Sequence, residues 1–294
     1  MNTRLSRRSV LKTLAGSAAL AGAAQWTSTA LAAEAGASRL KGNIRHSVSR
    51  WCYGKTTLDA LCAACKEIGI ESVELLGPDE WPVVKKHGLV CAMCNGPDSI
   101  GYGWNRVEHH EKLLAGFERM IPQVAEFGFP NIITFSGNRR GMSDEEGLKN
   151  CATGLKKLIP IAEKHKVTVI LELLNSKVDH KDYMADHTVW GVELCKQVGS
   201  DRLKLLYDIY HMQIMEGDII RTIKDNIAYI GHFHTAGNPG RRDLDEDQEL
   251  FYPAIMRTIA QLQEEGRFDG YVAHEFSPKH GPESLRRAVQ LCDV

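Results

Sequence analysis

The sequence of 294 residues lacks several features that mark common classes of protein. Its formal net charge is −1 and its basic residues do not gather into a stripe, which argues against binding to nucleic acid or to an acidic membrane surface. No G-x-G-x-x-G follows the first expected strand, so the usual dinucleotide-binding fingerprint is absent. Beyond residue 33 no run is long and apolar enough for a membrane span. Hydrophobic residues at 43% and charged residues at 25% are typical of a globular chain that buries a large core.

The first 33 residues have the pattern of an export signal. Ser6 to Lys12 reads SRRSVLK with paired arginines, an Ala-rich apolar run follows from Leu14 to Ala24, and Ala30 to Ala32 supplies a small-x-small cleavage site. An amphipathic amino-terminal helix is the alternative, but the paired arginines, the short apolar run and the Ala-x-Ala site fit it poorly. We therefore expect a twin-arginine signal, recognition by the twin-arginine export machinery, and a soluble mature protein that is periplasmic or otherwise exported.

Eight cysteines in an exported protein suggest disulfides, but their placement argues otherwise. Cys62 and Cys65 lie among apolar residues at helical spacing, which predicts small core residues of one helix. Cys91 and Cys94 flank an expected strand. The two C-x-x-C pairs also allow a zinc site, although they lack the Gly-rich knuckles that such sites use. Export in the folded state is compatible with reduced thiols.

From Asn43 onward the sequence repeats one unit, a short β-branched or apolar run followed by a loop and an amphipathic segment. The runs predicted as strands are Ile44–Val48, Ser72–Leu76, Leu89–Met93, Asn131–Phe135, Val167–Leu173, Leu203–Asp208, Ile227–His234 and Tyr271–Phe276. The segments predicted as helices are Leu58–Ile68, Trp81–Lys86, Val107–Phe127, Asp144–His165, Thr188–Val198, Asp218–Asn226, Tyr252–Glu265 and Glu283–Cys292. Gly69, Gly128 and Gly266 are predicted to follow the ends of helices.

Eight strands alternating with eight helices predict a parallel sheet. A doubly wound open sheet alternates in the same way. The count of eight and a mature length near about 250 residues favour closure into a (β/α)8 TIM barrel. No linker or change in composition divides the chain, so we expect a signal peptide at residues 1–33 and one α/β barrel domain over residues 40–294.

Four successive predicted strands end in residues that can bind a metal ion. In TIM barrels the active site lies at the carboxyl ends of the strands. These ends carry Glu172, Asp208, His234 and Glu275. Glu172 and Asp208 directly follow apolar runs, where a charged side chain is costly to bury unless a partner neutralises it.

Three carboxylates and one imidazole form a hard, oxygen-rich ligand set. This set matches one divalent ion, Mn²⁺, Mg²⁺ or Co²⁺, better than a structural zinc site. Each residue alone could instead cap a helix or pair with an arginine, but four in phase on adjacent strands predict a metal site. The chemistry that suits such a site is proton transfer next to a carbonyl through an enediolate.

The segment from Leu206 to Asp218 (LYDIYHMQIMEGD) resembles the signature of the hydroxypyruvate isomerase family. That family belongs to the xylose isomerase-like TIM barrels, together with the ketose 3-epimerases. Further positions fall where the family has motifs, namely Glu172 with Asn175, Gly231-His232 with Asn238-Pro239, and His274-Glu275-Phe276. The resemblance covers nearly the whole chain after the signal.

The resemblance implies a metal-dependent isomerase acting on a small carbohydrate or hydroxy-keto acid. It implies that the four strand-end residues are the metal ligands, and that Glu172 and Glu275 are also the catalytic acid–base pair. It places Asn175 near the substrate, His211 on a substrate hydroxyl or carbonyl oxygen, and Arg241 toward the anionic or hydroxylated end of the substrate. Packing at a helix start is the alternative for His211, and a solvated loop charge is the alternative for Arg241, whose neighbour Arg242 is open to the same role.

The substrate and the reaction stay open at this point. His234 stands where hydroxypyruvate isomerases often have Gln and the sugar epimerases have His, whereas Val178 replaces a Glu of those epimerases. A ketose 3-epimerase, or a lyase acting on 3-keto sugars, would use the same enolate. A further hypothesis is that the protein is not an enzyme but a carbohydrate-binding barrel that retains the metal. The presence of both glutamates argues against it. A homo-oligomer is also left open.

Two tryptophans in predicted rim loops have equally open roles. Trp51 follows the first predicted strand, and Trp104 lies in the loop after the third. Either ring is suited to stacking on a sugar face, and either is equally suited to packing at the rim.

Overall fold

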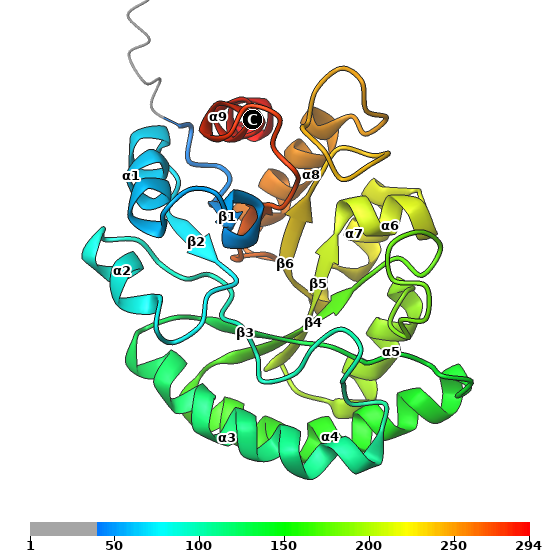
Figure 1. Ribbon diagram of the computed structural model, residues 1–294. Helices are drawn as coiled ribbons and strands as arrows, with labels where there is room; N and C mark the ends of the chain where they lie inside the picture. The colour runs from blue at the N-terminus through cyan, green and yellow to red at the C-terminus, as the bar shows by residue number, and fades with distance from the viewer. Residues whose placement is uncertain (1–39) are drawn as a thin grey trace, which may run out of the picture. The chain divides into compact units, whose positions relative to one another are not determined.

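Seven short parallel strands form the centre of the structure, a computed structural model that describes residues 40–294. They are β1 (His46–Ser49), β2 (Ser72–Glu74), β3 (Asn131–Thr134), β4 (Thr168–Leu173), β5 (Leu203–Asp208), β6 (Ile230–Thr235) and β7 (Val272–His274). Their order in the sheet is β2-β1-β7-β6-β5-β4-β3, and helices surround them in Figure 1. The predicted TIM barrel is therefore confirmed. The expected export signal at residues 1–33 lies outside the described residues and stays a prediction.

The predicted strand Leu89–Met93 is not a regular strand, although it occupies the strand position between β2 and β3. Val90 forms a single parallel bridge with Ser72, and Cys94 forms one with Ile132. Backbone hydrogen bonds join the segment to its neighbours at Val90, Met93 and Cys94, and at Ala92 side chains take their place. Ser72 Oγ accepts the N–H of Ala92 at 2.9 Å, and Asn131 Nδ2 donates to the carbonyl of Ala92 at 2.8 Å. The segment closes the barrel without the repeating pattern that defines a strand.

The helices agree closely with the predicted amphipathic segments. They are α1 (Leu58–Ile68), α2 (Trp81–Lys86), α3 (His110–Glu126), α4 (Asp144–His165), α5 (Thr188–Val198), α6 (Ile209–Met215), α7 (Ile219–Asn226), α8 (Tyr252–Glu264) and α9 (Pro282–Cys292). Sequence analysis missed α6, and the first residues of the predicted strand Ile227–His234 form a 3-10 turn over Ile227–Tyr229. Among the described residues, no helix combines the length and the apolar character needed to cross a bilayer.

Local signals fix where these helices begin and end. The Ser143 side chain accepts the backbone N–H of Glu146 at the start of α4, and so satisfies a donor that the first helical turn leaves free. Gly69 follows α1 with a φ of 95° and donates its N–H to the Cys65 carbonyl. Gly128 and Gly266 also have positive φ angles, as predicted for residues that follow helix ends.

Alternation along the strands separates two buried layers. In β4, Val169, Leu171 and Leu173 belong to the main core between sheet and helices, whereas Ile170 belongs to a separate cluster inside the barrel. Glu172 shares the inward parity of Ile170, because successive side chains of a strand point to opposite faces. The inner face of a strand thus leads directly to the site.

The barrel interior has two chemically different halves. The apolar half is formed by β3, β4, β5 and the segment before β3, and its side chains are those of Met93, Ile133, Ile170 and Leu206. The polar half is formed by β1, β2 and β6, and its buried side chains are those of Ser47, Ser72, Glu74, His232 and His234. Both halves lie beneath the carboxyl ends of the strands.

The cysteines of the two C-x-x-C pairs are buried. Cys62 and Cys65 lie on the core side of α1, which confirms the prediction from their helical spacing. Cys91 and Cys94 lie in the segment that closes the barrel, and their sulfur atoms are 3.7 Å apart. All eight cysteines of the chain are free thiols in the structure.

Candidate metal centre

The four predicted ligands converge at the carboxyl ends of β4, β5, β6 and β7. One ligand atom from each of Glu172, Asp208, His234 and Glu275 lies within 4.8 Å of the others, and all four side chains are buried. His234 Nδ1 is 2.8 Å from Glu275 Oε2, 3.7 Å from Glu172 Oε1 and 3.9 Å from Asp208 Oδ2. Four strands that are neighbours in the sheet (Figure 1) thus deliver one compact cluster.

The cluster fits a divalent cation by its unsatisfied atoms. Glu172 Oε1 and Asp208 Oδ2 are buried without a hydrogen-bond partner, which is costly for carboxylate oxygens. Burial, together with the negative charge of Glu275, raises the pKa of Glu172 to about 8, and burial raises the pKa of Asp208 to about 6. Both shifts show that the cluster favours added positive charge. Carboxylate oxygens and one imidazole are a donor set for Mn²⁺, Mg²⁺ or Co²⁺.

Asp208 has a second task that fixes its orientation. Its Oδ1 accepts the backbone N–H groups of Tyr210 at 2.8 Å and His211 at 3.2 Å, and so caps the start of α6. A carboxylate at this position satisfies two donors of the first helical turn. Its other oxygen, Oδ2, is left to face the cluster.

His211 presents a hydrogen-bond donor to the same space. The backbone N–H of Asn175 donates to His211 Nδ1 at 3.2 Å, so Nδ1 is the acceptor and Nε2 carries the hydrogen. Nε2 is buried, has no partner, and lies 3.7 Å from Asp208 Oδ2. Burial and the positive charge of Arg241 hold the pKa of His211 well below its usual value, which keeps the ring neutral. His211 lies at a helix start, as its alternative interpretation required, and its free nitrogen also faces the site.

Arg241, rather than Arg242, lies at the ligand cluster. Its Nη2 donates to Glu275 Oε2 and is 3.7 Å from Asp208 Oδ2, whereas Arg242 bonds the backbone carbonyl of Asp247. Burial alone would lower the pKa of Arg241, but Glu275 and Asp208 hold it above its usual value. Burial alone would raise the pKa of Glu275, but the charges of His234 and Arg241 bring it well below its usual value. Glu172 and Glu275 thus have opposite pKa shifts within one site.

Asn175 is buried behind this surface. Its Oδ1 accepts the N–H groups of Val178 and Asp179, and its Nδ2 donates to Asp179 Oδ2 at 2.7 Å. The same Nδ2 lies 2.6 Å from His211 Nδ1. These bonds organise the loop after β4 and hold the His211 ring. The predicted contact of Asn175 with substrate stays a prediction.

The structure separates the two tryptophans. Trp51 is 47% exposed, and its Nε1 donates to Glu275 Oε1 at 2.6 Å, so its ring lies at the rim of the site. The Arg241 guanidinium lies 5.1 Å from the centre of the same ring, within cation–π range. Trp104 is fully buried and donates to Thr134 Oγ1 at 2.7 Å. Packing is therefore the role of Trp104, and stacking on a sugar remains open only for Trp51.

Sequence analysis missed two residues near the cluster. Glu74 ends β2, and its Oε1 lies 2.8 Å from His234 Nε2. It interrupts an apolar run as Glu172 does, so the search that found the four ligands would have found it if applied to the second strand. His180 lies in the loop after β4, with its ring centre 5.4 Å from that of His211 and its Nε2 without a partner. A loop residue of this kind carries no periodic signal in the sequence.

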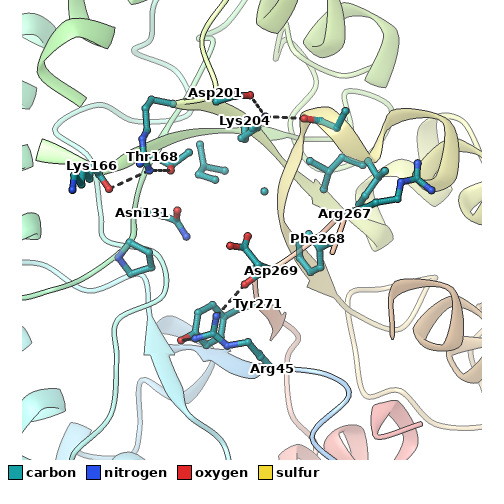
Figure 2. Close-up of a pocket in the computed structure, with 18 of the residues that line it drawn as sticks. Arg45, Asn131, Lys166, Thr168, Asp201, Lys204, Arg267, Phe268, Asp269 and Tyr271 are labelled. Carbon is teal, nitrogen blue, oxygen red and sulfur yellow. Dashed lines mark hydrogen bonds and ion pairs between the residues drawn. The ribbon is translucent and has the colours of Figure 1, made fainter. Parts of the chain in front are cut away.

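A pocket of about 620 Å³ lies at the other ends of the strands, lined by Thr168, Lys204 and Ile230 (Figure 2). Of its basic side chains, those of Arg45, Arg202, Lys204 and Arg267 are bonded within the protein. Lys204 Nζ bonds Asp201 and a backbone carbonyl, and Arg202 bonds Thr168 and a second carbonyl. No predicted site residue lines this pocket. The chemistry therefore collects at the carboxyl ends, as expected for a TIM barrel.

Comparison with known proteins agrees with this geometry. The family model described as xylose isomerase-like TIM barrel matches residues 62–293. The chain belongs to this family. Within it, a 2-oxo-tetronate isomerase from Cupriavidus necator is 37% identical over 241 residues, which are 76% of this chain and 88% of that protein. A hydroxypyruvate isomerase from Escherichia coli is 30% identical over 142 residues, 47% of this chain and 52% of that protein.

A solved structure extends the agreement on the fold to three dimensions. The apo form of the 3-keto-D-glucoside 4-epimerase YcjR from E. coli superposes with a TM-score of 0.70 at 20% identity, covering 85% of this chain and 98% of that one. At this identity the likeness supports the fold alone. The relatives named above are isomerases, which confirms the predicted enzyme class and the resemblance to the hydroxypyruvate isomerase family.

Proposed function

We propose that the chain is a metal-dependent isomerase of a small hydroxy-keto acid, of the hydroxypyruvate or 2-oxo-tetronate type. One observation carries the proposal. Two glutamates, from β4 and β7, lie in one buried ligand cluster with the unpartnered oxygens of Glu172 and Asp208. The relatives named 2-oxo-tetronate isomerase and hydroxypyruvate isomerase support this substrate class.

The proposed ligands are the four residues of the cluster, Glu172, Asp208, His234 and Glu275. When bound, a divalent ion acts as a Lewis acid that lowers the cost of negative charge on a substrate oxygen. Arg241 supplies a positive charge from the protein itself, and the neutral His211 supplies a hydrogen-bond donor. The Nε2–H of His211 is the proposed donor to a substrate hydroxyl or carbonyl oxygen.

The acid–base work falls to the two glutamates. Glu172 has a raised pKa, so its carboxyl group suits the transfer of a proton to or from carbon. Glu275 is held ionised by His234 and Arg241 and suits the complementary role. Environments that push two carboxyl pKa values apart are the usual mark of an acid–base pair.

A hydroxy-keto acid brings a carboxylate that requires a cation. The Arg241 side chain is about one-fifth exposed, and its Nε has no hydrogen-bond partner. His180 offers a second nitrogen without a partner, and its ring centre lies 5.4 Å from that of His211. These two residues are the proposed contacts for the anionic end of the substrate.

The proposal is tested by metal analysis combined with deuterium exchange. The purified protein is assayed with hydroxypyruvate, 2-oxo-tetronate and neutral ketoses in D2O. We expect one divalent ion per chain and deuterium at the carbon next to the carbonyl. The expected product is an aldehyde from hydroxypyruvate and a 3-oxo acid from 2-oxo-tetronate. Failure to bind a divalent ion, or exchange that persists in both Glu172→Gln and Glu275→Gln, would contradict the proposal.

The same experiment distinguishes the alternatives. Inversion at one carbon of a neutral ketose would identify a 3-epimerase, and elimination from a 3-keto sugar would identify a lyase. Binding without any exchange would favour a carbohydrate-binding barrel that has no turnover. Each of these outcomes replaces the isomerase proposal.

We also propose that the chain is exported in folded form. The proposal is supported by the paired arginines Arg7 and Arg8 and by the cleavage pattern Ala30 to Ala32. Cell fractionation of a tagged full-length chain tests it. A variant with lysine at both arginine positions is expected to stay in the cytoplasm, and equal export of this variant would contradict a twin-arginine route.

A further inference from the structure

Glu74 lies directly behind the imidazole of His234. Its Oε1 is 2.8 Å from His234 Nε2 and 3.0 Å from His232 Nε2, and its Oε2 accepts the Ser47 hydroxyl at 2.6 Å. None of these four side chains is accessible to solvent. A carboxylate is retained in this interior because three donors satisfy it.

The two nitrogens of His234 face different groups. Nε2 faces Glu74, whereas Nδ1 faces Glu275, Glu172 and Asp208. A neutral imidazole carries one hydrogen, and the hydrogen bond made by one nitrogen decides which atom keeps a free lone pair. Both nitrogens lie 2.8 Å from a carboxylate oxygen, Nδ1 from Glu275 and Nε2 from Glu74, but only Glu74 stands outside the ligand cluster. An ion in the cluster would take the lone pair of Nδ1, and the one remaining hydrogen would then lie on Nε2, where Glu74 accepts it.

We propose that Glu74 is a positioning residue for the metal centre, which holds His234 with Nε2–H bonded and the Nδ1 lone pair turned toward the other three ligands. The inference rests on the proposed function, since it assumes that His234 binds the ion. Carboxylates behind ligating histidines orient the ring and raise its basicity as a ligand. His232 donates to the same oxygen and fixes the carboxylate against rotation.

A second ion held by Glu74, His232 and His234 is the competing explanation, since these three also lie within ligating distance of one another. It would require His234 to give up its remaining hydrogen and bind one ion through each nitrogen. The observed N···O separations of 2.8 and 3.0 Å are those of N–H···O hydrogen bonds. These distances favour a hydrogen-bonded Glu74 over a second ion. The number of ions bound per chain distinguishes the two explanations.

The test compares Glu74→Gln and Glu74→Leu with the wild type. Metal-free protein is titrated with Co²⁺, and binding is followed by the visible absorption of the ion and by calorimetry. Glu74→Leu is expected to weaken Co²⁺ binding about 10- to 100-fold. Glu74→Gln keeps an acceptor for His234 Nε2–H and is expected to recover part of that loss. Asp98→Asn is the matched control, because it also removes a buried carboxylate but one that bonds Thr134 and Phe135.

A second readout does not depend on the folding of any variant. Nitrogen-15 spectra of the wild-type protein loaded with Mg²⁺ are expected to show His234 protonated at Nε2. A hydrogen on Nδ1 would overturn the inference even if Glu74→Leu failed to fold. A folded Glu74→Leu variant with wild-type Co²⁺ affinity would overturn it as well.

The failures of the two proposals are distinguishable. A wild-type protein that binds no Co²⁺ contradicts the proposed metal-dependent function. A wild-type protein that binds one ion, with an affinity that Glu74 does not influence, contradicts only the positioning role. Two ions per chain, one of them lost in Glu74→Leu, would make Glu74 a ligand rather than a positioning residue.

Discussion

The two halves of the barrel interior use the same strand geometry for opposite purposes. Glu172 ends above the apolar half, keeps an oxygen without a partner, and has a pKa raised by burial to about 8. Glu74 ends in the polar half and is equally buried. Burial alone would raise its pKa, but His232 and His234 bring it down to about 2. Burial does not by itself decide the charge of a carboxyl group, because the hydrogen-bond donors and charges within reach also shift its pKa.

This difference divides the work of the site. The apolar half excludes water beneath Glu172, so its proton affinity is high, and Leu206 of β5 lies directly beside it in the ladder. The polar half holds His234 in one orientation through hydrogen bonds. The apolar half raises the pKa of Glu172, and the polar half fixes the orientation of the His234 ring.

The largest effect on activity is expected from neutralising the two catalytic candidates, Glu172 and Glu275. Glu172→Gln and Glu275→Gln are each expected to lower kcat about 10²- to 10⁴-fold, because general acid–base catalysis contributes that much. Steady-state assays with the best keto-acid substrate measure the loss. Glu118→Gln, on the exposed side of α3, is the control and should retain full activity. Loss of less than tenfold in both variants would remove the acid–base assignment.

Removing packing from the apolar half should affect stability next most strongly. Leu206 is fully buried inside the barrel. Leu206→Ala is expected to lower the free energy of unfolding by about 2–5 kcal/mol, from lost burial and a cavity. Urea denaturation measures this change. Val189→Ala, at a residue that is 75% exposed, should change it by less than about 0.5 kcal/mol. Equal effects of the two substitutions would show that the apolar half is not tightly packed.

Removing a donor from the polar half should have a smaller effect. Ser47→Ala deletes the hydroxyl that bonds Glu74 Oε2, a hydrogen bond to a charged group worth about 1.5–3 kcal/mol. The same denaturation experiment measures the loss, with the exposed Ser99→Ala as control. If Ser47→Ala proved neutral, Glu74 would need no third donor, and the two halves would differ less than the hydrogen bonds indicate.

The smallest expected effect concerns the rim. Trp51→Phe keeps an aromatic ring but removes the N–H that bonds Glu275 Oε1. We expect a decrease in kcat/KM of about two- to tenfold, or about 0.5–1.5 kcal/mol. This is less than for a buried hydrogen bond to a charged group because Trp51 is 47% exposed. The same substitution in a Glu275→Gln background should cost less, because coupled residues are not additive. Full additivity of the two changes would show that Trp51 acts independently of Glu275.

Much of this arrangement could be predicted from the sequence. Strand ends in a parallel barrel lie at one rim, so Glu172, Asp208, His234 and Glu275 could be brought together without coordinates. Helices with a clear apolar stripe, such as α1 and α4, were predicted with their observed boundaries. Both results depend on periodic burial, which the sequence records directly.

Other features depend on contacts between distant residues and escaped prediction. Helix α6 starts immediately after β5 without a loop, and it is mostly buried, so no amphipathic stripe distinguishes it from a strand. The segment Leu89–Met93 has the composition of a strand, but at Ala92 its backbone bonds the side chains of Ser72 and Asn131 instead of backbone groups. The choice between Arg241 and Arg242 was set by the conformation of the loop after β6, where Arg241 has a φ of 51°. The family resemblance had pointed to Arg241, but residue type alone does not separate it from the neighbouring Arg242.

The closing segment between β2 and β3 is joined to each of these strands in part by side chains. Neighbouring regular strands are joined by backbone hydrogen bonds, whose donors and acceptors nearly every residue type provides. At Ala92 the joining groups are the side chains of Ser72 and Asn131, which only particular residues provide. Substitution of Ser72 therefore weakens the contact of the segment with β2, and substitution of Asn131 weakens its contact with β3. Hydrogen exchange at the Ala92 N–H is therefore expected to be faster in Ser72→Ala than in the wild type, because that substitution removes its acceptor.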